Sequence, residues 1–153
     1  MSLTQAEADG LLKLPKVFVD VDVLEFRRTE PMNSTSVLRS HDRREEFLFD
    51  LKRGRRNRLR LKYQTRARRV VILARLELDG PRHRNPPGQP YRPGECISGS
   101  HLHLYREGFD DRIAYLLEEV DDWVTPVDDG VTALEGFLSF CGVDPRPRIQ
   151  TAL

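Results

Sequence analysis

Hydrophobic and polar residues alternate along much of the chain, and a period of two predicts β-strands. The odd positions from 17 to 23 are all valine, with Asp20 and Asp22 between them. The strands expected from such patterns are residues 17–26, 37–39, 45–52, 57–66, 69–78 and 101–106. Segment 69–78 is the most apolar and is expected to be the central strand. Residues 29–36 are polar and contain a proline, which predicts a loop.

Two helices are expected near the termini. Thr4 and Glu7 have the spacing of a capping box, which predicts a helix over residues 4–13. Apolar residues at helical spacing predict a second helix over 131–141, closed by Gly142. The segment 109–120 fits either a helix or a strand, and residues 145–148 are expected to form a tail.

These elements predict an α+β fold in a single domain of residues 1–153. We expect an antiparallel, meander-like sheet of about five or six strands, with the N- and C-terminal helices packed on one face. The loop expected over residues 79–100 is much longer than the other connections between the predicted elements. Loops of that length are usually functional or disordered, and we interpret this one as functional.

Composition indicates the class of protein and predicts its cellular compartment. A chain of 153 residues with 39% hydrophobic and 32% charged residues is typical of a globular domain. It has no apolar stretch of membrane-spanning length and no pattern of a secretion signal, so we expect a cytoplasmic protein without membrane contact. Cys96 and Cys141 are accordingly expected to be reduced thiols.

Charge divides the chain into two unequal halves. Residues 1–78 hold 18 Lys/Arg and 11 Asp/Glu, a balance of +7, whereas residues 79–153 hold 7 and 13, a balance of −6. The basic half predicts a polyanionic partner. Alternatively, the acidic C-terminal half neutralises the basic half, or mediates self-association or contact with a protein partner.

The positive charge is densest in a predicted hairpin, with ten Lys/Arg between residues 52 and 69. Its candidate nucleic-acid-binding residues are Lys52, Arg53, Arg55, Arg56, Arg58, Arg60 and Lys62. Strand alternation is expected to place Arg58, Arg60 and Lys62 on one face, where they match phosphates along a backbone. Tyr63 is the only aromatic residue among them, which favours backbone contact over base stacking. A solvated strand face is the alternative.

Three of the four histidines lie in or beside the loop, and alternation over 101–107 places His101, His103, Tyr105 and Glu107 on one face. Two imidazoles can share acid and base duties in cleaving RNA without a metal or cofactor. His83 is expected to join them, Arg106 to hold the phosphate and Tyr105 to donate a proton.

The same residues support two other interpretations. His101, His103 and Glu107, with His83, are a ligand set typical of zinc or non-haem iron. In the other interpretation, the three histidines hydrogen-bond the backbone and hold the loop to the sheet.

Three blocks resemble a small uncharacterised bacterial family: the N-terminal segment Leu3 to Ala8, the basic segment Leu51 to Arg55, and the loop Leu78 to Gly88 that leads to His101–Gly108. An association with toxin–antitoxin systems enters by analogy only. The first hypothesis is therefore a nucleic-acid-acting protein, a metal-independent endoribonuclease of toxin type with RNA as its partner. A non-catalytic nucleic-acid- or protein-binding module, such as an antitoxin or inhibitor, is the second, and a metal-dependent enzyme the third.

Overall fold

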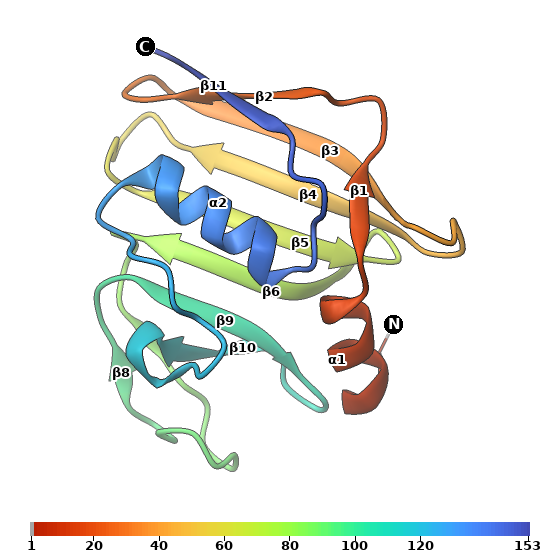
Figure 1. The fold of residues 1–153 in the computed structure, drawn as a ribbon. Coiled ribbons are helices and arrows are strands. Elements are labelled where there is room, and N and C mark those ends of the chain that lie inside the picture. The colour runs from red at the N-terminus through yellow and green to blue at the C-terminus, as the bar shows by residue number, and fades with distance from the viewer. Residues whose placement is uncertain (1) are drawn as a thin grey trace.

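A seven-stranded antiparallel sheet forms the body of the protein in the computed structural model, which describes residues 2–153 (Figure 1). In spatial order its strands are β1 (Lys16–Phe18), β3 (Met32–Ser40), β4 (Glu46–Arg53), β5 (Leu61–Ala67), β6 (Val71–Leu78), β9 (His101–Arg106) and β10 (Asp110–Leu116). Neighbouring strands follow one another along the chain, except that β2 (Val23–Arg27) intervenes between β1 and β3 and the long segment 79–100 between β6 and β9. The predicted α+β meander is confirmed, with seven strands in place of five or six, and β5 occupies the middle position expected for β6.

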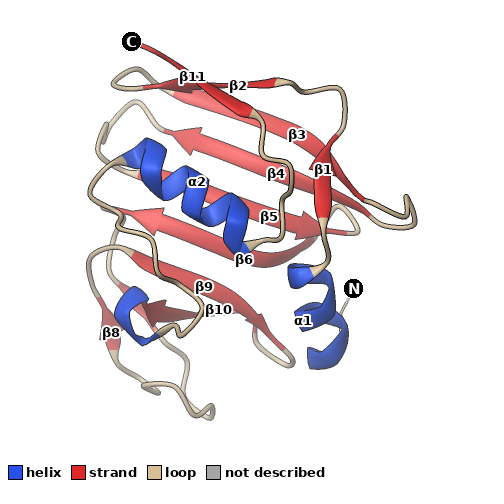
Figure 2. Ribbon diagram, in the orientation of Figure 1, coloured by secondary structure: helices blue, strands red, loops and turns tan. Residues whose placement is uncertain are grey.

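Helices lie near both ends of the chain (Figure 2). Helix α1 (Gln5–Lys13) begins at the predicted capping box, in which the Thr4 hydroxyl accepts from the Glu7 amide and the Glu7 carboxylate accepts from the Thr4 amide. It packs against β6 and β9. Helix α2 (Gly130–Phe140) lies over one face of the sheet (Figure 1). Its Phe137 ring packs against Phe49 and Tyr63.

Alternation divides the sheet into an apolar face and a polar face. Phe47, Phe49 and Leu51 of β4 are buried in the core that α2 covers. The residues between them point the other way, and so do Lys62, Gln64 and Arg66 of β5. We call this second side of the sheet the outer face. It carries both groups of candidate functional residues.

Two predicted boundaries are wrong near the N-terminus. The strand expected over 17–26 is broken by a bend at Asp20, which has a positive φ of 57°, into β1 and β2 (Val23–Arg27). The polar segment 29–36 is mostly strand, because β3 pairs with β4 from Met32 onward. Backbone pairing in register therefore outweighs the polar composition of this segment.

Two further corrections concern loops. The expected tail 145–148 leads into β11 (Arg148–Ala152), which pairs in parallel with β2. The loop 79–100 contains a short hairpin of β7 (His83–Arg84) and β8 (Cys96–Ile97). Asn85 fixes it to β10, since its side chain donates to the Ala114 carbonyl and accepts from the Ala114 amide.

The segment 109–120, whose sequence fitted either a helix or a strand, is β10 followed by a 3-10 turn, η1 (Leu117–Glu119). Both cysteines are free, Cys96 exposed and Cys141 buried. Within residues 2–153, no helix has the length and apolar character to cross a membrane.

Candidate functional site

The predicted basic residues separate into two groups. The strand expected over 57–66 begins only at Leu61, because residues 57–60 form a turn in which the Leu59 amide donates to the Asn57 side chain. Arg58 and Arg60 are therefore not on a strand face with Lys62. Arg58 lines a different hollow, together with Asp128 and Asp129.

The β4–β5 turn and the adjacent strand ends enclose a hollow of about 440 Å³ on the outer face. Its basic lining residues are Lys52, Arg53, Arg55, Arg56, Arg60 and Lys62. Two of these have partners inside the protein. Arg53 is buried and donates to the carbonyls of Arg27 and Arg58, whereas Arg60 lies 3.4 Å from Glu77.

The other four cations of the hollow, Lys52, Arg55, Arg56 and Lys62, lie beyond 4 Å from every carboxylate in residues 2–153. Lys52 and Lys62 are directly opposite each other in the β4–β5 register. Like charges at opposed positions are destabilising. Burial, and after it the charges of Lys52 and Arg75, lowers the pKa of Lys62. The hollow therefore keeps an uncompensated positive charge.

The acidic half of the chain does not neutralise this charge. Among the described residues, two ion pairs join a cation of the first half to a carboxylate of the second, Lys13 with Asp122 and Arg75 with Asp111. Neither involves a residue of the hollow. Across residues 2–153, no ion pair within 4 Å therefore joins the acidic half to the hollow.

The predicted histidines do come together. The ring centroid of His83 lies 4.7 Å from that of His103 and 6.4 Å from that of His101, and the His101 and His103 rings are 5.0 Å apart. His101 and His103 are 0% and 1% exposed. Segment 79–100 lies beside them, since its His83 ring packs edge-on against His103 and its Asn85 bonds Ala114 of β10.

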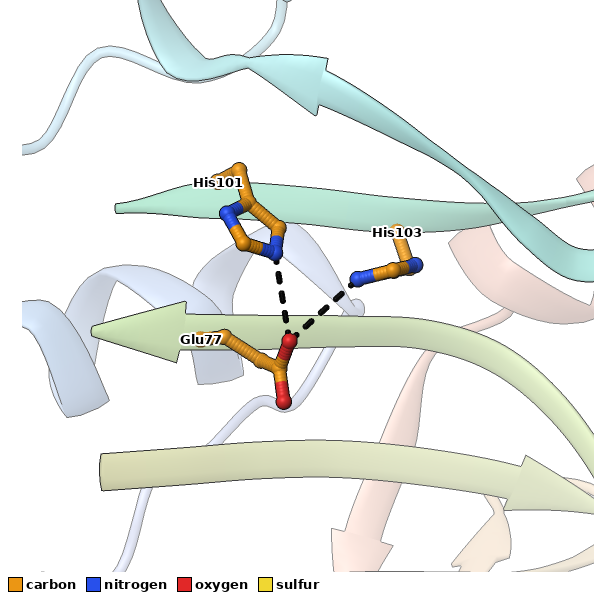
Figure 3. A group of neighbouring side chains, drawn as sticks. All are labelled: Glu77, His101 and His103. Atoms are coloured by element: carbon orange, nitrogen blue, oxygen red, sulfur yellow. Dashed lines mark hydrogen bonds and ion pairs between the residues drawn. The ribbon is translucent and has the colours of Figure 1, made fainter. Parts of the chain in front are cut away.

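A carboxylate that the sequence did not single out lies between two of these rings. Glu77 of β6 is directly opposite His101 of β9, and its Oε2 lies 3.1 Å from His101 Nε2 and 3.4 Å from His103 Nε2 (Figure 3). Its Oε1 faces Arg60 at 3.4 Å and Arg75 at 4.0 Å. We call Glu77, His101 and His103 the histidine–glutamate cluster.

Charges around Glu77 keep it ionised. Burial alone would raise its pKa, but the bond from His101, the approach of His103 and the charge of Arg75 outweigh burial and hold the pKa below its ordinary range. For His103, burial lowers the pKa more than Glu77 raises it. The cluster is thus a buried carboxylate that faces two buried imidazoles.

Each histidine also bonds a backbone carbonyl. Nδ1 of His101 is 2.9 Å from the Gly99 oxygen, Nδ1 of His103 is 2.9 Å from the Asp111 oxygen, and Nε2 of His83 is 2.6 Å from the Arg112 oxygen. The His83 and His101 bonds join segment 79–100 to the sheet. They support the interpretation in which histidines hold the loop in place.

Three other predicted site residues point elsewhere. The Tyr105 hydroxyl donates to the Leu3 carbonyl and accepts from the Leu3 amide. Arg106 donates to the Tyr115 hydroxyl, and the Glu107 carboxylate accepts from the Gln5 amide. The structure therefore does not support a metal site that contains Glu107. The carboxylate beside His101 and His103 is that of Glu77.

The basic hollow and the histidine–glutamate cluster are neighbours. Lys52, Lys62, Glu77 and His101 are successive partners across β4, β5, β6 and β9. Arg60 lines the hollow and contacts Glu77. One row across the outer face therefore connects the two groups.

A family model matches residues 3–143. The chain belongs to DUF6978, a family of unknown function. The range matched by DUF6978 contains both the basic hollow and the cluster, whereas β11 lies beyond it. Neither a curated protein nor a solved structure matches the chain.

Proposed function

We propose that the protein binds a nucleic acid by its phosphate backbone at the basic hollow. The observation that carries the proposal is the set of four cations, Lys52, Arg55, Arg56 and Lys62, that surround one hollow without a carboxylate partner within the described chain. A polyanion would supply the missing counter-charge and release its own condensed ions in doing so.

The surroundings of the hollow favour backbone contact over recognition of bases. Tyr63, the only aromatic residue of the hairpin, is 0% exposed and donates its hydroxyl proton to the Gly130 carbonyl on the α2 side. It offers no surface on which a base can stack. We therefore expect binding to depend on charge and salt, with little preference for sequence.

The geometry favours binding over cleavage. A general acid or base must come within hydrogen-bond reach of its substrate. His101 and His103 are almost fully buried and their Nδ1 atoms face backbone carbonyls. RNA cleavage by this pair stays a prediction, and the burial counts against it.

The test is the salt dependence of binding. Changing Lys52, Arg56 and Lys62 together to Ala removes three phosphate contacts, each worth about 0.7 to 0.9 in the log–log slope. We expect the slope for a fluorescent single-stranded RNA or duplex DNA to fall by about 2 to 3. The variant should be no less stable than the wild type, because it removes the opposed Lys52 and Lys62.

A matched control variant removes three positive charges from the opposite end of strands β4 and β5. Arg43, Arg44 and Arg69 are exposed residues of the β3–β4 and β5–β6 turns, so changing them to Ala should leave the slope nearly unchanged. Equal losses in both triple variants would mean that total charge, not the hollow, attracts the ligand. Wild-type protein that binds neither RNA nor DNA at low salt would refute the proposal.

A further inference from the structure

The histidine–glutamate cluster brings two imidazole nitrogens and one carboxylate oxygen together in the interior of the protein. A backbone carbonyl only accepts, so the bonds to Gly99 and Asp111 place the hydrogen of each imidazole on Nδ1. A ring that carries only this hydrogen has an unshared electron pair on Nε2, whereas a second hydrogen on His101 Nε2 is donated to Glu77 Oε2 at 3.1 Å. Both Nε2 atoms point at the same carboxylate oxygen, Glu77 Oε2, which also carries lone pairs.

One of these atoms has no partner. His103 Nε2 is buried and makes no hydrogen bond in residues 2–153, although Oε2 is 3.4 Å away. Buried polar atoms of native proteins are rarely left unpaired, and an unpaired one calls for an ion, a water or another ligand. A cation that replaces the hydrogen between His101 Nε2 and Glu77 Oε2 would be bound by three electron-pair donors, namely these two atoms and the unpaired His103 Nε2.

We infer that Glu77, His101 and His103 bind a divalent transition-metal ion of the zinc class through Oε2 and the two Nε2 atoms. Two imidazoles and one carboxylate are a ligand set of zinc sites. Zinc ligands at about 2.0 to 2.1 Å in a tetrahedral arrangement stand roughly 3.3 Å apart. The Oε2–Nε2 separations of 3.1 and 3.4 Å match this spacing, and all three donor atoms lie within 4.8 Å of one another.

The surrounding contacts orient the ligands as a metal site requires. Metal-binding histidines usually donate their second ring hydrogen to a carbonyl or carboxylate, which fixes the free nitrogen toward the ion. The Gly99 and Asp111 carbonyls do this here. Arg60 and Arg75 face Oε1, which leaves Oε2 for the metal, and Asp111 pairs with Arg75 and offsets its charge.

Three protein ligands leave a fourth position for water or a bound molecule, as in catalytic zinc sites. His83 does not belong to the group of converging donor atoms; its Nε2 faces the Arg112 carbonyl and its ring lies beside that of His103. The site is independent of the nucleic-acid proposal. Either can fail while the other holds, since zinc binding needs none of Lys52, Arg56 and Lys62.

The experiment titrates the full chain with Zn²⁺ alone, after treatment with a chelator and its removal, using calorimetry or competition with a chromophoric chelator. We expect one zinc per chain and a rise in melting temperature that depends on zinc concentration. Glu77→Gln and His103→Ala should each weaken zinc binding at least about a hundredfold, more than the loss of an outer-shell partner. His41→Ala, which changes the histidine that bonds the distant Asp144 carbonyl, should bind like the wild type.

If Glu77→Gln or His103→Ala fails to fold, the wild-type titration still decides. Folded wild-type protein that takes up no zinc overturns the inference. So does stoichiometric zinc that folded Glu77→Gln and His103→Ala keep unchanged. Nitrogen-15 NMR of the histidines gives a second readout, because zinc should shift the Nε2 signals of His101 and His103 and leave His41 in place.

Discussion

Lys16 shows how far a single residue can depart from what its type suggests. It is 0% exposed at the start of β1, and its ammonium nitrogen lies 2.7 to 2.9 Å from the carbonyl oxygens of Leu11, Leu12, Leu14 and Cys141, which share its three hydrogens. It also lies 4.5 Å from the centre of the Phe47 ring. One buried cation thus joins the end of α1, β1 and the end of α2, although a lysine is ordinarily expected at the surface.

This burial predicts a pH dependence of stability. Burial lowers the pKa of Lys16 from 10.5 to about 8. Between about pH 8 and pH 10.5 the unfolded chain therefore holds a proton that the folded protein has lost. The contribution of Lys16 to the free energy of unfolding should rise with pH in this window, by up to about 1.4 kcal/mol per pH unit.

Urea unfolding at several pH values measures this slope. Lys16→Met keeps a long side chain without the ionisable group, so its unfolding free energy should lack the contribution of Lys16 to the rise. Parallel slopes in both proteins would assign the effect to other groups. Burial raises the pKa of Cys141 from 9.0 to about 12, so above about pH 9 this thiol contributes a fall in the unfolding free energy with pH. The fall is present in both proteins, and the difference between the wild type and Lys16→Met isolates the contribution of Lys16.

At the scale of the elements, two glycines lie inside helices, and they differ in how much space surrounds them for a side chain. A Cβ added to Gly10 of α1 meets nothing within 4 Å. A Cβ added to Gly136 of α2 falls 2.5 Å from the side chain of Thr125, a contact too short for any real side chain. Gly136 therefore permits the close approach of α2 to the segment that leads into it.

The two glycines give a paired prediction. Gly10→Ala should raise the free energy of unfolding by roughly 0.5 to 1 kcal/mol, the propensity difference in a helix interior. Gly136→Ala gains the same propensity but forces an overlap, and should be less stable than wild type by about 1 to 3 kcal/mol. Chemical unfolding of the two variants measures both changes. Similar stabilities for the two variants would show that α2 can move away from Thr125 without cost.

The elements also show what the sequence can predict. The capping box of α1 and the alternation in β4 and β5 follow from local patterns, and the structure confirms them. The histidines were found from the spacing of His101 and His103. Glu77 was not found, because its role depends on the pairing of β6 with β9 across 24 residues of chain. The available signal was a charged pair, Arg75 and Glu77, on one face of an otherwise apolar strand.

For the whole molecule, the unequal charge of the two halves does not correspond to two surfaces that face each other. The acidic residues pair mostly within their own half, as Glu119 does with Arg92 and Glu135 with Arg146. The outer face therefore presents the basic hollow beside the histidine–glutamate cluster in one cross-strand row. A backbone bound in the hollow would lie next to the cluster, although His101 and His103 themselves are buried.

The burial of His101 and His103 gives a prediction that distinguishes a binding protein from a ribonuclease. Because both imidazoles are shielded, we expect labelled RNA to stay intact during long incubation with wild-type protein, at neutral pH, under conditions in which it is bound. Gel analysis of the RNA, with and without added Zn²⁺, measures this directly. Products ending in a 2′,3′-cyclic phosphate that folded His101→Ala and His103→Ala fail to make would contradict the expectation and establish acid–base cleavage. The triple variant of Lys52, Arg56 and Lys62 identifies contamination, because a contaminating nuclease would cut equally in its presence.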